Sequence, residues 1–202
     1  MASSNERLIL ASASSARAAL LRDAGVAFDI EPAHIDERIV KAEARGAGDS
    51  ALAAATALAF AKARTISAGC PQALVIGADQ ILAAGDEWFD KPENVQQAGE
   101  QLRRLRGRVH ILATAVCIVC DSIRLWQAAA APRLTMRAFG DSFLEAYLAA
   151  EGEAVLGSVG SYRLEGRGAQ LFERIDGDYF SILGLPLLEL LGFLRERGVL
   201  PR

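Results

Sequence analysis

Short apolar runs alternate with alanine- and leucine-rich segments along the chain, and this pattern predicts a layered protein of strands and helices. Strands are expected at residues 7–12, 27–31, 74–77, 109–119, 123–130 and 172–175, with a hairpin over 81–89. Helices are expected at residues 18–24, 50–68, 93–105, 142–150 and 184–197. A tight turn joins the two long middle strands, so the sheet is expected to be mixed rather than wholly parallel.

The composition is that of an ordinary soluble globular protein, with 51% apolar and 23% charged residues among 202. The net charge of −3 argues against binding along nucleic acid, which needs a basic surface. No apolar run is long enough for a membrane helix, and the first ten residues lack the pattern of a cleaved signal peptide. The three cysteines favour a reducing compartment, so a cytoplasmic protein that binds neither membrane nor nucleic acid is expected.

Asp79 is the first candidate for chemistry, because it follows the buried apolar strand that ends at Gly77. In open α/β sheets, ligand-binding groups gather at the carboxyl ends of strands. Asp79 therefore stands where a metal ligand or a general base is expected. The alternative is a structural aspartate that starts a turn or caps a helix.

A second candidate site follows the first strand. Ser12 and Ser14 lie in a short polar turn before a helix, where free backbone N–H groups can bind an anion. Arg17 lies one turn into that helix, with a guanidinium suited to phosphate. The turn lacks the glycines and the lysine of a P-loop, and the alternative is an ordinary serine cap beside a solvated arginine.

Four other features carry candidate residues, and the first of them gains interest only if the fold brings it near Asp79. They are the adjacent carboxylates Asp36 and Glu37 on a polar loop, Lys62 near the end of a helix, Lys91 before a proline, and the glycine-rich stretch 157–172. The proline holds the backbone of Lys91 extended and so aims its ammonium. The glycine-rich stretch indicates a loop pressed against a ligand or another backbone, or else a flexible surface loop.

Seven stretches, in this order, resemble the motifs of the Maf family of nucleotide pyrophosphatases, and they cover nearly the whole chain. They are Ser12-Ala13-Ser14-Ser15-Ala16-Arg17, Asp36-Glu37, Lys62-Ala63, Gly77-Ala78-Asp79-Gln80, Lys91-Pro92, Gly160-Ser161-Tyr162 with Glu165-Gly166, and Gly184-Leu185-Pro186. The resemblance implies a single domain over residues 1–202, with a twisted mixed sheet flanked by helices and two lobes around a cleft. This α/β fold is similar to that of the inosine-triphosphate pyrophosphatases.

The resemblance also implies an activity: hydrolysis of a nucleoside triphosphate to the monophosphate and pyrophosphate with a divalent metal, Mg²⁺ or Mn²⁺. The family is often dimeric, which makes a homodimer one of the expected assemblies. By position, Asp79 resembles the family's catalytic proton acceptor, and Glu37 and Asp79 are the expected metal ligands. Whether Asp79 is the general base or only a metal ligand stays open. The expected substrate-binding residues are Ser12, Ser14, Arg17, Lys62 and Lys91.

Three positions that differ between branches of the family correspond to Ala16, Gln80 and Glu165. Gln80 and Glu165 resemble the branch that acts on 7-methyl-GTP, whereas that branch has tryptophan in place of Ala16. Glu165 can accept the two neighbouring donors of guanine, and Gln80 is expected to pair with the carbonyl edge of the base. Alanine at position 16 cannot stack on a cationic purine as a tryptophan could.

A 7-methyl-GTP pyrophosphatase is therefore the expected protein. One alternative is a pyrophosphatase for dTTP, UTP or other non-canonical nucleotides. Another is a catalytically weak nucleotide-binding regulator of cell division, for which Ser15 and Ala16 argue because both depart from the family pattern. A haloacid-dehalogenase-type phosphatase would need two aspartates after the first strand, where this chain has serines.

Overall fold

The structure is a computed structural model that describes residues 6–201. Its strands are β1 (Leu8–Leu10), β2 (Asp29–Ile30), β3 (Leu74–Ala84), β4 (Glu87–Phe89), β5 (Val109–Cys120), β6 (Ile123–Ala130), β7 (Arg133–Met136) and β8 (Phe172–Asp176). Its α-helices are α1 (Ser15–Asp23), α2 (Glu37–Gly46), α3 (Ala51–Ser67), α4 (Val95–Leu105), α5 (Asp141–Glu151), α6 (Tyr179–Ile182) and α7 (Leu187–Glu196). Short 3-10 helices cover Gly152–Gly157 and Arg167–Leu171.

Within residues 6–201 the strands form one mixed sheet in the order β2-β1-β3-β5-β7-β8, with β4 paired to β3 and β6 paired to β5. β1 runs parallel to β2 and β3, whereas β5 is antiparallel to β6 and β7. The predicted α/β class with a mixed sheet flanked by helices is confirmed. None of the helices in this part of the chain combines the length and the hydropathy that a bilayer-spanning segment needs.

The chain divides into two compact units, which agrees with the expectation of two lobes. The first unit comprises the chain up to Gln80, together with Thr114–Ala130 and the chain from Asp178 onward. The second unit comprises Ile81–Ala113 and Ala131–Gly177. β3 begins in the first unit and ends in the second, and β5 does the reverse.

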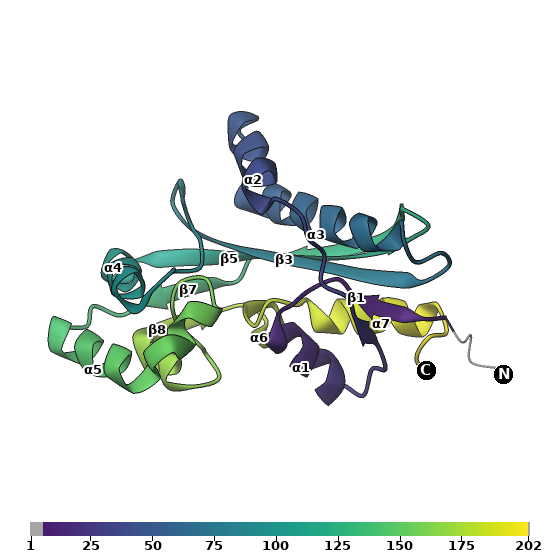
Figure 1. The fold of residues 1–202 in the computed structure, drawn as a ribbon. Helices are drawn as coiled ribbons and strands as arrows, with labels where there is room; N and C mark the ends of the chain where they lie inside the picture. The colour runs from purple at the N-terminus through teal and green to yellow at the C-terminus, as the bar shows by residue number, and fades with distance from the viewer. Residues whose placement is uncertain (1–5, 202) are drawn as a thin grey trace. The chain divides into compact units, whose positions relative to one another are not determined.

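Helices cover both faces of the strands in the first unit. In β3, Leu74, Ile76 and Ala78 alternate along the strand and point to one face, where they join an apolar core with residues of α1 and α7. Val116 and Ile118 of β5 belong to the same core. In Figure 1, α1 and α7 lie on one side of β3, and α3 lies along the other.

The opposite face of β3 packs against α3. A Cβ atom on Gly77 would lie 2.7 Å from the Cβ of Ala63 and 2.0 Å from the carbonyl oxygen of Ala59, so the two backbones are in close contact. Because successive side chains of a strand point to opposite faces, Asp79 shares the α3 face with Gly77. Gln80 points to the other face, that of the core with α1 and α7.

The second unit is built around the outer parts of β3 and β5. β3 turns back at Gly85 into β4, and this confirms the hairpin predicted over 81–89. An aromatic cluster forms its interior, where the ring of Tyr162 lies 5.7 Å from that of His110 and 4.8 Å from that of Phe172. β7 and β8 complete this part of the sheet as an antiparallel pair.

Two predictions about the elements were wrong, and one strand was missed. The strand expected to end at Gly77 continues to Ala84, so Asp79 lies within β3 rather than after it. The polar loop expected around Asp36 and Glu37 is the start of a helix, α2, with the Asp36 carboxylate accepting a hydrogen bond from the backbone N–H of Arg38. β7 was not predicted at all.

Candidate active site

Lys62 lies between two carboxylates of the first unit. Its ammonium Nζ is 2.5 Å from Asp79 Oδ1 and 2.7 Å from Glu37 Oε1. The side chains of Lys62 and Asp79 are buried, whereas that of Glu37 is 43% exposed. Three residues separated widely along the sequence, on α2, α3 and β3, therefore meet at one cation.

The close packing of β3 on α3 explains why Lys62 reaches Asp79. Lys62 follows Ala59 by three residues and so lies on the same side of the helix as Ala59 and Ala63. Those small residues allow the glycine of β3 to touch the helix backbone, and Asp79 lies two residues beyond it on the same face. A larger side chain at Gly77 would move the helix away and lengthen the ion pair.

Charge also sets the state of Glu37. Burial raises the pKa of its carboxyl, but the hydrogen bond and charge of Lys62, with Lys41 and Arg17, outweigh this effect. The net result is a pKa below the ordinary value of a glutamate. Glu37 is therefore an ionised carboxylate at neutral pH and a permanent acceptor for a cation.

The polar turn predicted after the first strand lies beside this cluster. β1 pairs with β3 from Leu8 opposite Leu74 to Leu10 opposite Ile76, and then it ends. Asp79 lies three residues beyond that last pair, in the part of β3 that continues past the end of β1. The carboxyl end of β1 leads directly into the turn of Ser12 and Ser14.

Ser12 and Ser14 organise the start of α1. Ser14 caps the helix by accepting a hydrogen bond at its hydroxyl from the backbone N–H of Arg17. Ser12 Oγ accepts two bonds, one from the Ser14 N–H at 3.2 Å and one from Arg17 Nη1 at 3.1 Å. Ala16, the second residue of α1, is half-buried. The serine cap of the alternative interpretation is thus present, but the arginine is not solvated.

Arg17 is a buried cation with neutral partners. Its Nε donates a 2.8 Å hydrogen bond to the carbonyl oxygen of Gly184, just before α7. Burial lowers the pKa of Arg17, and the negative charges of Asp79 and Glu37 oppose that shift. The guanidinium is therefore fixed by serine and carbonyl oxygens while it stays within electrostatic reach of both carboxylates, an arrangement suited to an incoming anion.

Gln80 has its amide hydrogens bound within the protein. Its Nε2 lies 2.8 Å from Thr114 Oγ1, 3.0 Å from the carbonyl oxygen of Ser181 and 3.1 Å from that of Ile182. The expectation that Gln80 pairs with the carbonyl edge of a base requires a free N–H, so it disagrees with this geometry. No sequence signal identifies Thr114 or α6 as partners of Gln80.

The second unit holds the other predicted residues. Lys91 is exposed and follows the hairpin, before the buried Pro92. Glu165 lies in a tight turn where its Oε1 is 3.3 Å from Arg163 Nε. Gly168 closes that turn, since a Cβ there would lie 2.4 Å from the Arg163 carbonyl oxygen.

The glycine-rich motif at 160–162 is structural within its unit. Ser161 is fully buried with a positive φ of 62°, and its hydroxyl donates to Gln101 Oε1 at 3.1 Å. The Tyr147 hydroxyl donates to the Ser161 carbonyl oxygen, and the Tyr162 hydroxyl contacts His110 Nε2 at 2.8 Å. These bonds fix the loop that carries Glu165, so this part of the stretch is neither flexible nor exposed.

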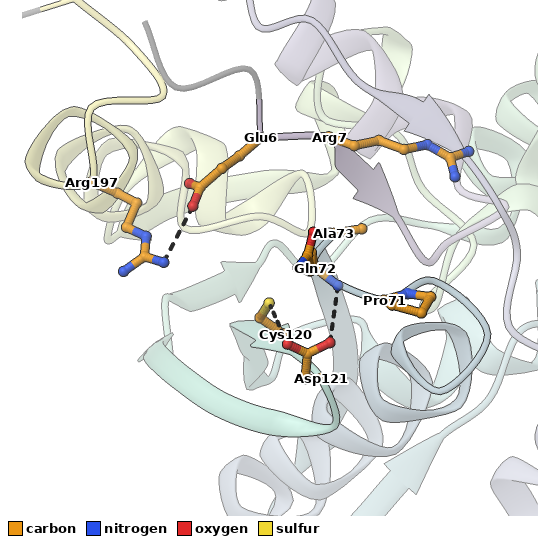
Figure 2. A pocket seen from close by; sticks show the side chains of 8 residues that line it. All are labelled: Glu6, Arg7, Pro71, Gln72, Ala73, Cys120, Asp121 and Arg197. Atoms are coloured by element: carbon orange, nitrogen blue, oxygen red, sulfur yellow. Dashed lines mark hydrogen bonds and ion pairs between the residues drawn. The ribbon is translucent and has the colours of Figure 1, made fainter.

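A pocket of about 600 Å³ opens elsewhere on the first unit. Figure 2 shows its lining, in which Arg197 reaches Glu6 and the Asp121 carboxylate accepts from the backbone N–H of Gln72. Cys120 is among the residues that line it. None of the predicted site residues lines this pocket.

The carboxylates are the groups that could hold a metal. No cluster of three or more histidine, cysteine, aspartate or glutamate side chains placed to bind a metal occurs within residues 6–201. Asp79 and Glu37 nevertheless present oxygens to one cation, that of Lys62. One or two carboxylates suffice for Mg²⁺, which keeps several waters and takes its remaining ligands from substrate phosphates. Both residues are thus of the oxygen-donor type that a hard divalent cation prefers.

Comparisons with known proteins agree with these features. The profile of the family described as "Maf-like protein" matches residues 7–197. A protein of Granulibacter bethesdensis named nucleoside triphosphate pyrophosphatase is 53% identical over 96% of this chain and 98% of its own length. One of Rhodospirillum rubrum with the same name is 50% identical over 96% of each chain. One of Rhizobium etli named 7-methyl-GTP pyrophosphatase is 47% identical over 96% of this chain and 98% of its own.

Proposed function

This chain belongs to the Maf family, and from that premise we propose that it is a nucleoside triphosphate pyrophosphatase, which releases pyrophosphate and a nucleoside monophosphate. The observation that carries the proposal is the meeting of Lys62, Asp79 and Glu37 within electrostatic reach of Arg17. A triphosphate has about four negative charges that must be held while the bond to the α-phosphorus breaks. This group of residues supplies cations and a proton acceptor together.

Each residue has a role that follows from its contacts. Arg17, with its guanidinium already oriented by Ser12 and Gly184, binds phosphate oxygens. The buried carboxylate of Asp79 accepts the proton of the water that attacks the α-phosphorus, and the pyrophosphate leaves from the opposite side. Lys62 holds Asp79 in place and contributes positive charge to the site.

A divalent cation, Mg²⁺ or Mn²⁺, is part of the proposal. Asp79 and Glu37 are the residues that would hold it, since each is a carboxylate with a second oxygen besides the one bonded to Lys62. Such an ion neutralises phosphate charge and lowers the pKa of a water molecule bound to it. Glu37, with its lowered pKa, stays ionised and able to bind the ion well below neutral pH.

We further propose 7-methyl-GTP as the substrate. A relative named 7-methyl-GTP pyrophosphatase is 47% identical to this chain. Gln80 and Glu165 resemble the residues at the corresponding positions of the 7-methyl-GTP branch. A carboxylate at Glu165 suits a base that is both a double donor and cationic. Ala16 offers no ring to stack on that base, so we expect weaker selectivity than a tryptophan would give.

The experiment for the reaction is the Asp79→Asn variant, assayed for pyrophosphate release from a panel of canonical and methylated triphosphates with Mg²⁺ or Mn²⁺. Asparagine keeps the size of the side chain and cannot accept the proton, so kcat should fall about 100-fold or more. The matched control is Asp86→Asn in the exposed turn of the β3–β4 hairpin, which should retain activity. A near-wild-type rate for Asp79→Asn would remove the mechanism.

The base preference has a separate test in Glu165→Gln. Replacing the carboxylate with an amide removes its charge and one acceptor, so kcat/KM for 7-methyl-GTP should fall while that for UTP changes less. If the ratio of the two substrates is the same as in the wild type, Glu165 does not read the base.

A further inference from the structure

The side-chain amide of Gln80 has only two hydrogens and three acceptors around it. Two of those acceptors are the carbonyl oxygens of Ser181 and Ile182, which cannot donate. The third, Thr114 Oγ1, has its own proton directed to the Ser181 carbonyl oxygen at 3.0 Å, so toward Gln80 it too can only accept. The atom facing these three groups must therefore be the nitrogen Nε2, which fixes the orientation of the amide.

The fold places these groups together through two neighbouring strands and one short helix. Gln80 and Thr114 lie on β3 and β5, which are neighbours in the sheet. Ser181 and Ile182 belong to α6, which is capped by Asp178 through a 2.7 Å bond to the Ser181 N–H. Thr114 is fully buried, whereas Gln80 is half-buried, so the glutamine remains within reach of a ligand.

What Gln80 can offer a ligand follows from this. Both hydrogens of Nε2 are used, and within residues 6–201 no hydrogen bond to its oxygen Oε1 is found. We propose that Thr114 and the two carbonyls of α6 lock the amide of Gln80, so that it presents only the acceptor Oε1 to the base. Thr114 is then a positioning residue for base selection, and the group that Gln80 recognises is an N–H donor on the base rather than a carbonyl oxygen.

This inference rests on the proposed function, because it assigns a base contact in the nucleotide that the enzyme would hydrolyse. It reverses the hydrogen-bond polarity expected from the sequence. A guanine-type base has two adjacent donors, N1–H and the exocyclic amine, and the lock favours contact with one of them. A base that presents only acceptors at that point would leave two lone pairs facing each other and would be rejected.

The first measurement needs no catalysis. Hydrogen exchange of the Gln80 side-chain amide is followed by NMR, with the signal assigned by its loss in Gln80→Met. A locked amide should exchange about tenfold or more slowly than that of the exposed Gln96, and Thr114→Val should speed it up. Exchange of Gln80 as fast as that of Gln96 would overturn the proposal whatever the enzyme hydrolyses.

The second measurement concerns the base. Kinetic constants are compared for 7-methyl-GTP, its inosine analogue without the exocyclic amine, and its N1-methyl analogue without the N1–H. One of these deletions should cost the wild type about tenfold in kcat/KM, mostly through KM. In Thr114→Val that cost should shrink to about threefold or less, while Thr114→Ser, which keeps the hydroxyl, should restore it.

Thr56→Val is the matched control, because the Thr56 hydroxyl bonds only to the carbonyl of Leu52 in its own helix. It should leave the cost of each deletion unchanged. If Thr114→Val shows the full wild-type cost, or if neither deletion affects the wild type, Thr114 does not position Gln80 for the base. If no triphosphate is hydrolysed at all, the proposed function fails. In that case the cost of each deletion is measured from dissociation constants instead of kcat/KM. These values test the positioning of Gln80 by Thr114 independently of hydrolysis.

Discussion

A Cβ atom on Gly77 would lie 2.0 Å from the carbonyl oxygen of Ala59, so β3 and α3 touch backbone to backbone at the point that brings Lys62 to Asp79. No ordinary contact in a protein is that short. The glycine is required here for space rather than for backbone freedom, and the ion pair depends on it.

Gly77→Ala should therefore destabilise the protein and weaken the site together. We expect a loss of about 2 kcal/mol or more in the free energy of unfolding, because an added methyl group in a packed interior forces the helix to move. Activity should fall as Lys62 moves from Asp79. Urea unfolding and steady-state kinetics measure the two effects. Gly192→Ala in α7 is the control, since open space surrounds it and alanine favours a helix.

Lys62→Met should leave the buried Asp79 without the cation that compensates its charge. Breaking a buried ion pair from one side costs about 3 kcal/mol or more, so the unfolding midpoint in urea should fall clearly. Combining it with Asp79→Asn removes the uncompensated charge, and the double variant should be more stable than the sum of the single effects predicts. Strictly additive effects would show that the pair is not energetically coupled.

Gly184→Ala tests how the arginine is held. Gly184 has a φ of +100°, and a Cβ there would lie 3.3 Å from Arg17 Nε, which donates to the Gly184 carbonyl. Alanine should cost about 1–3 kcal/mol through backbone strain and should also raise KM for the triphosphate by displacing the guanidinium. Gly198→Ala has a similar φ of +82° with open space around it. It should lose stability without the change in KM.

His110 should make the protein sensitive to acid. Burial lowers its pKa from 6.5 to about 4, so between these values the unfolded chain binds a proton that the folded one does not. Stability should therefore fall as pH decreases through this range. Between pH 7.5 and pH 5.0, His110→Gln should lose about 2 kcal/mol less than the wild type in urea unfolding.

The control for this comparison is Tyr162→Phe, which removes the hydroxyl bonded to His110 Nε2 and keeps the imidazole. It should change the absolute stability and retain the loss at low pH. An equal loss for wild type and His110→Gln would show that His110 does not cause the acid sensitivity.

The sequence predicted the long elements well because their periodicity and turn residues are strong. α3 follows its serine cap at Ser50, and β5 and β6 flank the turn at Asp121 as expected. The predicted strand ends too early, because a glycine followed by an aspartate is typical of a strand end. In the structure, the apolar residues from Ile81 onward continue the same strand, β3. β7 has only four residues, too few for its alternation to stand out.

The candidate site residues could be proposed from the sequence where a local pattern of strand, turn and helix marks them. They could not be where their role depends on contacts between distant parts of the chain. Ser12, Ser14 and Arg17 follow from strand, turn and helix order. The start of α2 was missed, although Asp36 as a cap before Glu37 is a usable signal. The polarity of Gln80 depends on carbonyl groups about 100 residues away in sequence, and no local pattern encodes it.

Asp79 and Gln80 are joined by one peptide bond and face opposite sides of β3. The group assigned to water is anchored by α3, and the group assigned to the base is anchored by Thr114 and α6. Redesign of nucleotide selectivity at Gln80 can therefore leave the Lys62–Asp79 ion pair on the α3 face untouched, provided that the carbonyl of Gly184 keeps its hold on Arg17. A library restricted to positions 80 and 114 would sample new substrates while Lys62 and Asp79 keep their contact.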